Sequence, residues 1–142
     1  MGAWGHRSFE NDDAADWGAS LQHKDGRQRI SAAFAAVLKA DEDDEYLEAP
    51  AASQAVAAAE VVGALAGKPA ANLPPDVVEW VARNKLPNRG LIEVAKRVVS
   101  RVLENSELKD LWAEGGEDYA KPWQTELHGL LDRLDEAGRT TG

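Results

Sequence analysis

Residues 50–67 read PAASQAVAAAEVVGALAG, a segment mostly of alanine, valine and leucine with a single charge at Glu60. Alanine is the best helix former, and Pro50 is tolerated in a first turn, where no amide donor is required. Gly67 and Pro69 close the segment. A helix that is apolar on nearly every side is expected to occupy a central, largely buried place in the fold.

The rest of the chain also favours helices, because apolar residues recur at spacings of three and four and no segment has the pattern of a strand. The other helices are expected at Asp12 to Leu21, Gln28 to Ala40, Asp76 to Arg83, Leu91 to Glu104, Ser106 to Glu114 and Pro122 to Ala137. The sequence therefore predicts an all-α protein, a compact orthogonal bundle of about six or seven helices with an irregular N-terminal arm. Residues 1–138 are expected to form a single helical domain, and residues 139–142 a mobile C-terminal tail.

Composition excludes several classes of function. The chain has 142 residues and no cysteine, so disulfides, thiolate nucleophiles and cysteine-bound zinc are excluded. Its 16 basic and 25 acidic residues give a net charge of −9, which repels nucleic acid and anionic lipid and favours a basic partner. No export signal is visible, and the stretch from Ala49 to Gly67 is too small and polar for a membrane span. We expect a bacterial cytoplasmic protein that binds neither nucleic acid nor membranes.

The N-terminal segment combines Trp4-Gly5 with Phe9-Glu10-Asn11-Asp12-Asp13-Ala14-Ala15-Asp16-Trp17. Its carboxylates could form a cation-binding turn. Helix initiation is the simpler interpretation, because Asn11 is a preferred N-cap and Asp12 lies at the positive end of the helix dipole. Trp4 and Trp17 are interpreted as anchors that pin the N-terminal arm to the core.

Three further motifs follow along the chain: Tyr46-Leu47-Glu48-Ala49-Pro50, Ala58-Ala59-Glu60 and Ser106-Glu107-Leu108-Lys109-Asp110-Leu111-Trp112. Together with the N-terminal segment, they resemble the bacterial domain of unknown function 4259 family from about Met1 through Leu134. The positions that match the family pattern are Trp4, Gly5, Phe9, Asn11, Asp12, Asp16, Trp17, Leu47, Glu48, Ala59, Glu60, Ser106, Glu107, Leu108, Leu111 and Trp112. The chain departs from the pattern at His6-Arg7-Ser8, where family members usually have a small or glycine-rich stretch. Membership implies no known activity.

Glu60 is the only charged residue between Glu48 and Lys68. If it is buried, its carboxylate requires an arginine, an indole N–H or backbone donors. The alternative is a polar stripe with Ser53, which lies seven residues away on nearly the same helix face. A structural or exposed role is favoured over a functional carboxylate. The motifs also suggest that Glu48, Glu60 and Glu107 converge on the N-terminal arm and clamp its tryptophans and backbone amides.

An enzyme interpretation is weaker. Glu45-x-x-Glu48 and Glu107-x-x-Asp110 each place two carboxylates on one helix face, an arrangement that holds magnesium in helical pyrophosphohydrolases. A metal-dependent hydrolase would then use Glu48, Glu60, Glu107 and Asp110. No phosphate-binding loop accompanies these pairs, so we expect no catalytic residue, no metal site and no cofactor.

The favoured function is therefore a non-enzymatic protein-binding module. One version is an immunity-type inhibitor whose carboxylates cover a basic patch on a toxin or nuclease. The candidate binding residues are Trp4, Asn11, Asp12, Asp16, Trp17, Glu48, Glu60, Glu107 and Trp112.

Overall fold

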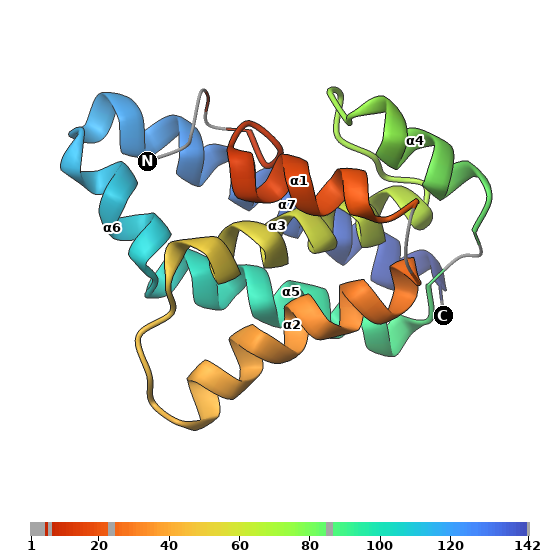
Figure 1. The fold of residues 1–142 in the computed structure, drawn as a ribbon, viewed down its shortest axis with the longest axis horizontal. Coiled ribbons are helices and arrows are strands. Elements are labelled where there is room, and N and C mark those ends of the chain that lie inside the picture. The colour runs from red at the N-terminus through yellow and green to blue at the C-terminus, as the bar shows by residue number, and fades with distance from the viewer. Residues whose placement is uncertain (1–4, 6, 23–24, 85–86, 142) are drawn as a thin grey trace.

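The computed structural model of the protein describes residues 5, 7–22, 25–84 and 87–141 (Figure 1). These residues contain no strand and form seven helices: α1 (Asp12–Ser20), α2 (Gly26–Glu42), α3 (Ala49–Leu65), α4 (Pro75–Ala82), α5 (Arg89–Glu104), α6 (Glu107–Glu114) and α7 (Glu117–Thr141). The prediction of an all-α bundle is confirmed. None of the helices in this part of the chain is long and apolar enough to cross a membrane.

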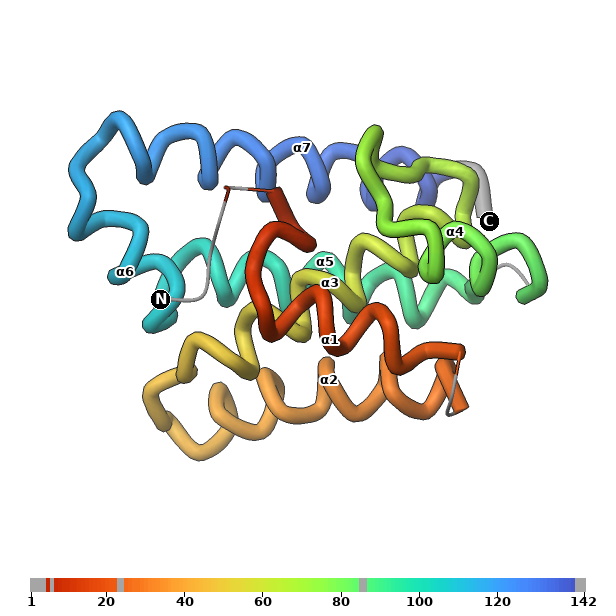
Figure 2. The backbone as a smooth tube through the Cα atoms, turned by 45° about the horizontal axis from the view of Figure 1, so that its top comes forward, coloured from red at the N-terminus to blue at the C-terminus, as the bar shows by residue number. Residues whose placement is uncertain are grey.

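Helix α3 is the centre of the bundle. It packs against each of the other six helices, and its residues 55–65 are all buried. Figures 1 and 2 show α3 in the middle of the molecule, with the other helices around it. Small alanine side chains leave room for neighbours on every side of a helix, so the composition of residues 50–67 accounts for this position.

Helices α5 and α7 pack together and also contact α3. Helix α5 buries one face, and α7 contributes aromatic and leucine side chains to the same hydrophobic core. The buried hydrophobic residues of these two helices are Ile92, Ala95, Val98, Val99, Val102, Trp123, Leu127, Leu130, Leu134 and Ala137. Their spacing of three and four is the period of a helix with one buried face.

Two predicted helix caps are confirmed. The Asn11 side chain accepts a hydrogen bond from the Ala14 amide at 2.8 Å, and Ser106 accepts one from the Lys109 amide at 3.0 Å. Each bond satisfies a first-turn amide that has no partner within its helix. After α3, Gly67 has a φ of 85°, a left-handed conformation that glycine adopts without a steric penalty.

The predicted bounds of the last helix are wrong at both ends. Helix α7 begins at Glu117 and contains Pro122 in its interior, and it continues through Thr141 rather than ending near Ala137. An ion pair at 2.6 Å between Arg139 and Asp135, one turn apart, supports its last turns. The described part of the expected tail is therefore helical, while its mobility and the single-domain assignment stay predictions.

Candidate functional site

Glu60 is buried in α3, where its side chain is 1% exposed. The Ser8 hydroxyl donates to Oε2 at 2.7 Å, and the Arg133 guanidinium donates to Oε1 at 2.9 Å and to Oε2 at 3.4 Å. Arg133 also donates to the Lys68 carbonyl at 3.1 Å. Of the three kinds of donor that the sequence suggested for a buried Glu60, the arginine is present. The carboxylate thus connects the N-terminal arm, α3 and α7.

A small cavity of about 110 Å³ lies beside this carboxylate. Its lining includes Arg7, Glu10 and Glu126, and Arg7 approaches Glu126 of α7 at 3.9 Å. Figure 2 shows the arm running from α1 toward α7. Both oxygens of Glu60 already accept hydrogen bonds from the protein, so this arrangement fastens the arm to the bundle.

Within the described residues, the predicted convergence of Glu48, Glu60 and Glu107 on the arm is seen for Glu60 alone. Glu107 instead accepts a hydrogen bond from the Ala49 amide at 2.7 Å, and its own amide donates to the Leu47 carbonyl at 2.8 Å. These two bonds join the beginnings of α3 and α6. Glu48 is exposed at the N-cap of α3, where its side chain makes no capping bond. Only Glu60 of the three reaches the described part of the arm.

The other predicted residues are dispersed. The Asn11 side chain is engaged in its cap, and Asp12 and Asp16 are exposed on α1. Trp112 is half-buried against the core. Trp4 lies outside the described residues. Trp17 is only 3% exposed and lies in the core, in agreement with an anchoring role.

The carboxylates of the hydrolase interpretation are not brought together. Asp110 accepts a hydrogen bond from the Tyr46 hydroxyl at 2.5 Å, while Glu60 is paired with Arg133 and Glu107 with the Ala49 amide. Among the residues that the structure describes, no three histidine or acidic side chains form a group that could hold a metal ion.

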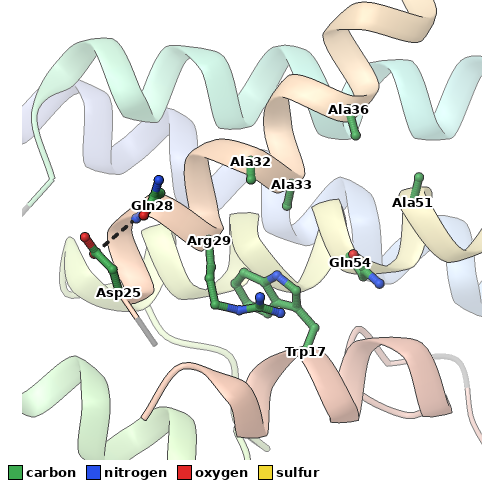
Figure 3. Close-up of a pocket in the computed structure, with 9 residues that line it drawn as sticks. All are labelled: Trp17, Asp25, Gln28, Arg29, Ala32, Ala33, Ala36, Ala51 and Gln54. Atoms are coloured by element: carbon green, nitrogen blue, oxygen red, sulfur yellow. Dashed lines mark hydrogen bonds between the residues drawn. The ribbon is translucent and has the colours of Figure 1, made fainter. Parts of the chain in front are cut away.

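A groove between α1, α2 and α3 offers a different site (Figure 3). Helices α1 and α2 both pack on α3, and the space that they enclose has a volume of about 380 Å³. Its lining comes from one side chain of α1, the first three turns of α2 and its cap, and the beginning of α3. The lining residues are Trp17, Asp25, Gln28, Arg29, Ala32, Ala33, Ala36, Ala51 and Gln54.

Two hydrogen-bond donors in this groove have no acceptor among the described residues. The Nε atom of Arg29 is buried without a hydrogen-bond partner, and the indole N–H of Trp17 donates to none of the side chains or carbonyls described. In Figure 3 the Arg29 side chain extends from α2 toward Trp17. Buried donors are normally paired, so the unpaired Nε of Arg29 points to an acceptor supplied from outside the chain, and the indole N–H of Trp17 is a second donor without an acceptor in the same groove.

The polar groups at the edges of the groove are differently occupied. The Asp25 side chain caps α2 by accepting a hydrogen bond from the backbone amide of Gln28 at 3.3 Å. Figure 3 shows its carboxylate turned toward Gln28 and away from the guanidinium of Arg29. The amide side chains of Gln28 and Gln54 each carry both a donor and an acceptor. Arg29 and Asp25 balance each other in formal charge, so the groove is polar but nearly neutral.

Of these lining residues, only Trp17 was a candidate from the sequence. The available signal was the set of small residues at positions 32, 33 and 36, which follow Arg29 at helical spacing. Small side chains are equally typical of close helix packing, so this pattern alone does not distinguish a groove from a packed interface.

A model of the family described as Domain of unknown function (DUF4259) matches residues 2–126. The chain belongs to this family. No curated protein and no solved structure matches the chain. The DUF4259 match includes Glu60 and every residue that lines the groove, whereas Arg133 lies beyond it.

Proposed function

We propose that this protein is a bacterial cytoplasmic, non-enzymatic protein-binding module that holds a segment of its partner in the groove between α1, α2 and α3. The observation that supports the proposal most strongly is the pair of unpaired donors, Arg29 and Trp17, in a groove of about 380 Å³. Partly buried indole and guanidinium groups are the side chains that most often contribute strongly to protein interfaces.

The alanines of the groove support a peptide segment as its occupant. Ala32 and Ala36 are exposed and Ala51 is half-buried, so a main chain can approach the helix backbones closely. Gln28 and Gln54 supply donors and acceptors of the kind that pair with peptide amides. A groove between helices with a few polar groups is a common setting for peptide recognition.

A partner with a basic surface is the second candidate, as for an immunity-type inhibitor. Asp12, Asp13 and Asp16 are exposed on α1, the helix that contributes Trp17 to the groove. Asp13 precedes Trp17 by four residues and so lies on the same side of the helix. Together with the net charge of −9, these carboxylates favour approach by a basic protein.

Site-specific photocrosslinking in cells of the source organism tests the groove. A benzophenone amino acid at Ala36, an exposed lining position, should yield one discrete protein adduct that the same amino acid at Ala113, exposed on α6, does not. A lining variant that fills the groove, Ala51→Trp, should remove the adduct while a thermal melt shows that the protein stays folded. Identical adduct patterns at both positions, or no adduct at Ala36, would overturn the proposal.

A metal titration separates this function from the hydrolase alternative. Binding of magnesium or manganese to the native state would raise the melting temperature. For a binding module we expect the same melting temperature with and without either ion. A rise of several degrees that disappears in Glu60→Gln would favour the hydrolase.

A further inference from the structure

The chemistry of the groove also indicates which group of the partner enters it. We propose that Arg29 binds a carboxylate carried by the partner segment, and this inference rests on the proposed function of the groove.

Arg29 differs from the arginines that stabilise the fold. Four of them pair with carboxylates of the chain: Arg7, Arg101, Arg133 and Arg139. The Arg29 side chain makes no hydrogen bond or ion pair with the described residues, and its Nε is buried. A guanidinium is always charged, and its planar set of donors matches the two oxygens of a carboxylate. An acceptor from outside the chain would therefore complete an interaction that the other four arginines complete within it.

The nearest acidic residue of the groove does not fill this role. Asp25 accepts from the Gln28 amide as the cap of α2, and in Figure 3 it points away from Arg29. Its negative charge still affects the choice of ligand. A single carboxylate leaves the groove with a small negative charge, whereas a phosphate dianion would add a second charge beside Asp25 in a protein of net charge −9. The electrostatics thus favour a carboxylate over a phosphate.

Trp17 supplies the second contact. Its ring is buried, and Figure 3 shows its indole nitrogen on the edge that faces α2, the helix that carries Arg29. An indole N–H donates one hydrogen bond and accepts none. A carboxylate that pairs with the guanidinium has further lone pairs available, so one group can accept from both side chains.

Chemical shifts of the Trp17 indole and the Arg29 side chain, recorded by NMR on the full chain, test this inference. The probes are four compounds: a capped alanine peptide with one glutamate, the same peptide with glutamine, an alanine peptide with a free C-terminal carboxylate, and inorganic phosphate. The glutamate peptide should shift both signals and bind roughly tenfold more tightly than the glutamine peptide, because a charge-assisted hydrogen bond replaces a neutral one. Comparison with the third probe shows whether the carboxylate belongs to a side chain or to a chain terminus.

Three variants complete the test. Arg29→Gln should abolish the preference for the glutamate peptide, and Arg29→Lys should weaken it by several fold because the planar set of donors is lost. Arg27→Gln removes the same charge from an exposed position of α2 outside the groove lining and should leave binding unchanged. Three results would each overturn the proposal that Arg29 binds a carboxylate: equal binding of the glutamate and glutamine peptides, a response to phosphate alone, or no shift with any probe. The Ala36 adduct would persist in these cases if the proposed function holds, and its absence would show that the function itself has failed.

Discussion

At the scale of single residues, Glu60 and Arg133 form an ion pair in which the carboxylate is buried and the guanidinium is partly exposed. The Glu60 side chain is 1% exposed and that of Arg133 is 23% exposed. The desolvation of a buried carboxylate is offset only when its oxygens are fully paired, and here Ser8 and Arg133 provide the pairing. These contacts therefore hold the arm in place mainly because its release would leave the buried Glu60 carboxylate incompletely paired.

Replacing this carboxylate tests its structural role. We expect Glu60→Gln to lower the free energy of unfolding by about 2 to 3 kcal/mol, because Arg133 loses its counterion and Ser8 its charged acceptor. Denaturant unfolding followed by circular dichroism measures the change. Glu48→Gln is the control, since Glu48 is exposed and makes no capping bond, and it should change stability by less than about 0.5 kcal/mol. Equal effects of the two substitutions would contradict a stabilising role for the buried Glu60 carboxylate and its partners.

Tyr46 provides a prediction about pH. Its hydroxyl donates to Asp110, and this hydrogen bond, followed by desolvation and the nearby negative charges, raises the pKa of Tyr46 from 10.0 to about 12. The raised pKa means that the neutral phenol is favoured in the folded state. The contribution to stability is complete below pH 10 and is lost as the pH rises through about 12.

An ultraviolet titration of the phenolate measures this shift. The transition near pH 12 should be absent in Tyr46→Phe and should move down toward 10 in Asp110→Asn, which removes the charge and leaves the tyrosine. A transition that stays near 12 in Asp110→Asn would show that the Asp110 carboxylate is not the cause.

Residue-scale features were predictable from the sequence only where their causes are local. The caps of Asn11 and Ser106 depend on amides three residues away. The need of a buried Glu60 for a donor follows from its apolar surroundings, but the donor itself, Arg133, is 73 residues distant. Glu107 was expected at the arm and instead caps α3, because the fold brings the beginning of α6 beside Ala49. Arg29 was missed for the same reason, since an unpaired side chain is recognised only once its neighbours are known.

At the scale of elements, the contact between α2 and α4 depends on a glycine. A Cβ atom at Gly26, the first residue of α2, would lie 2.4 Å from ring atoms of Trp80 in α4. We expect Gly26→Ala to destabilise the protein by about 2 kcal/mol, because a buried aromatic ring must move to admit the methyl group. Thermal unfolding measures the effect.

Gly129→Ala is the matched control within α7. No atom lies within 4 Å of a Cβ built there, and alanine is favoured over glycine in a helix by roughly 0.5 to 1 kcal/mol. This variant should therefore be slightly more stable than the parent protein. Stabilisation by Gly26→Ala as well would show that Trp80 does not pack as closely as the structure indicates.

Element positions were predicted well and their ends less well. Helices α1 and α5 begin within two residues of the expected positions, and in the structure Asn11 and Asn88 cap their starts. The expected start of α7 at about Pro122 followed from its apolar residues, the first of which is Trp123. In the structure the helix begins at Glu117, directly after Gly116 with its φ of 89°, and the acidic residues Glu117 and Asp118 lie in its first turn.

At the scale of the whole molecule, the fold places its least polar helix where every other helix can reach it. The segment at residues 50–67 predicted that α3 would be central, and α3 indeed packs against all six other helices. The identity of those contacts was not predictable, because a helix that is apolar on all sides has no preferred face to orient its neighbours. The groove likewise depends on how whole helices are arranged, since α1 and α2 both pack on α3 and enclose space between them.

This architecture predicts how stability is distributed through the molecule. Removing α3 from its place would separate all the other helices from their common neighbour, so its amides should exchange with solvent only when the whole protein unfolds. Residues 55–65 should therefore have exchange free energies equal to the global free energy of unfolding. Helices α4 and α6 are short and bury only Val77 and Trp80 in α4 and Leu108 in α6, so local opening should let their amides exchange at lower free energies. Hydrogen exchange followed by NMR at several denaturant concentrations measures both quantities. Glu60→Gln should then lower the exchange free energies of α3 and the global value by the same amount, because Glu60 lies in the middle of that helix. If α3 exchanged through local opening like α4, the central helix would not be the cooperative core of the bundle.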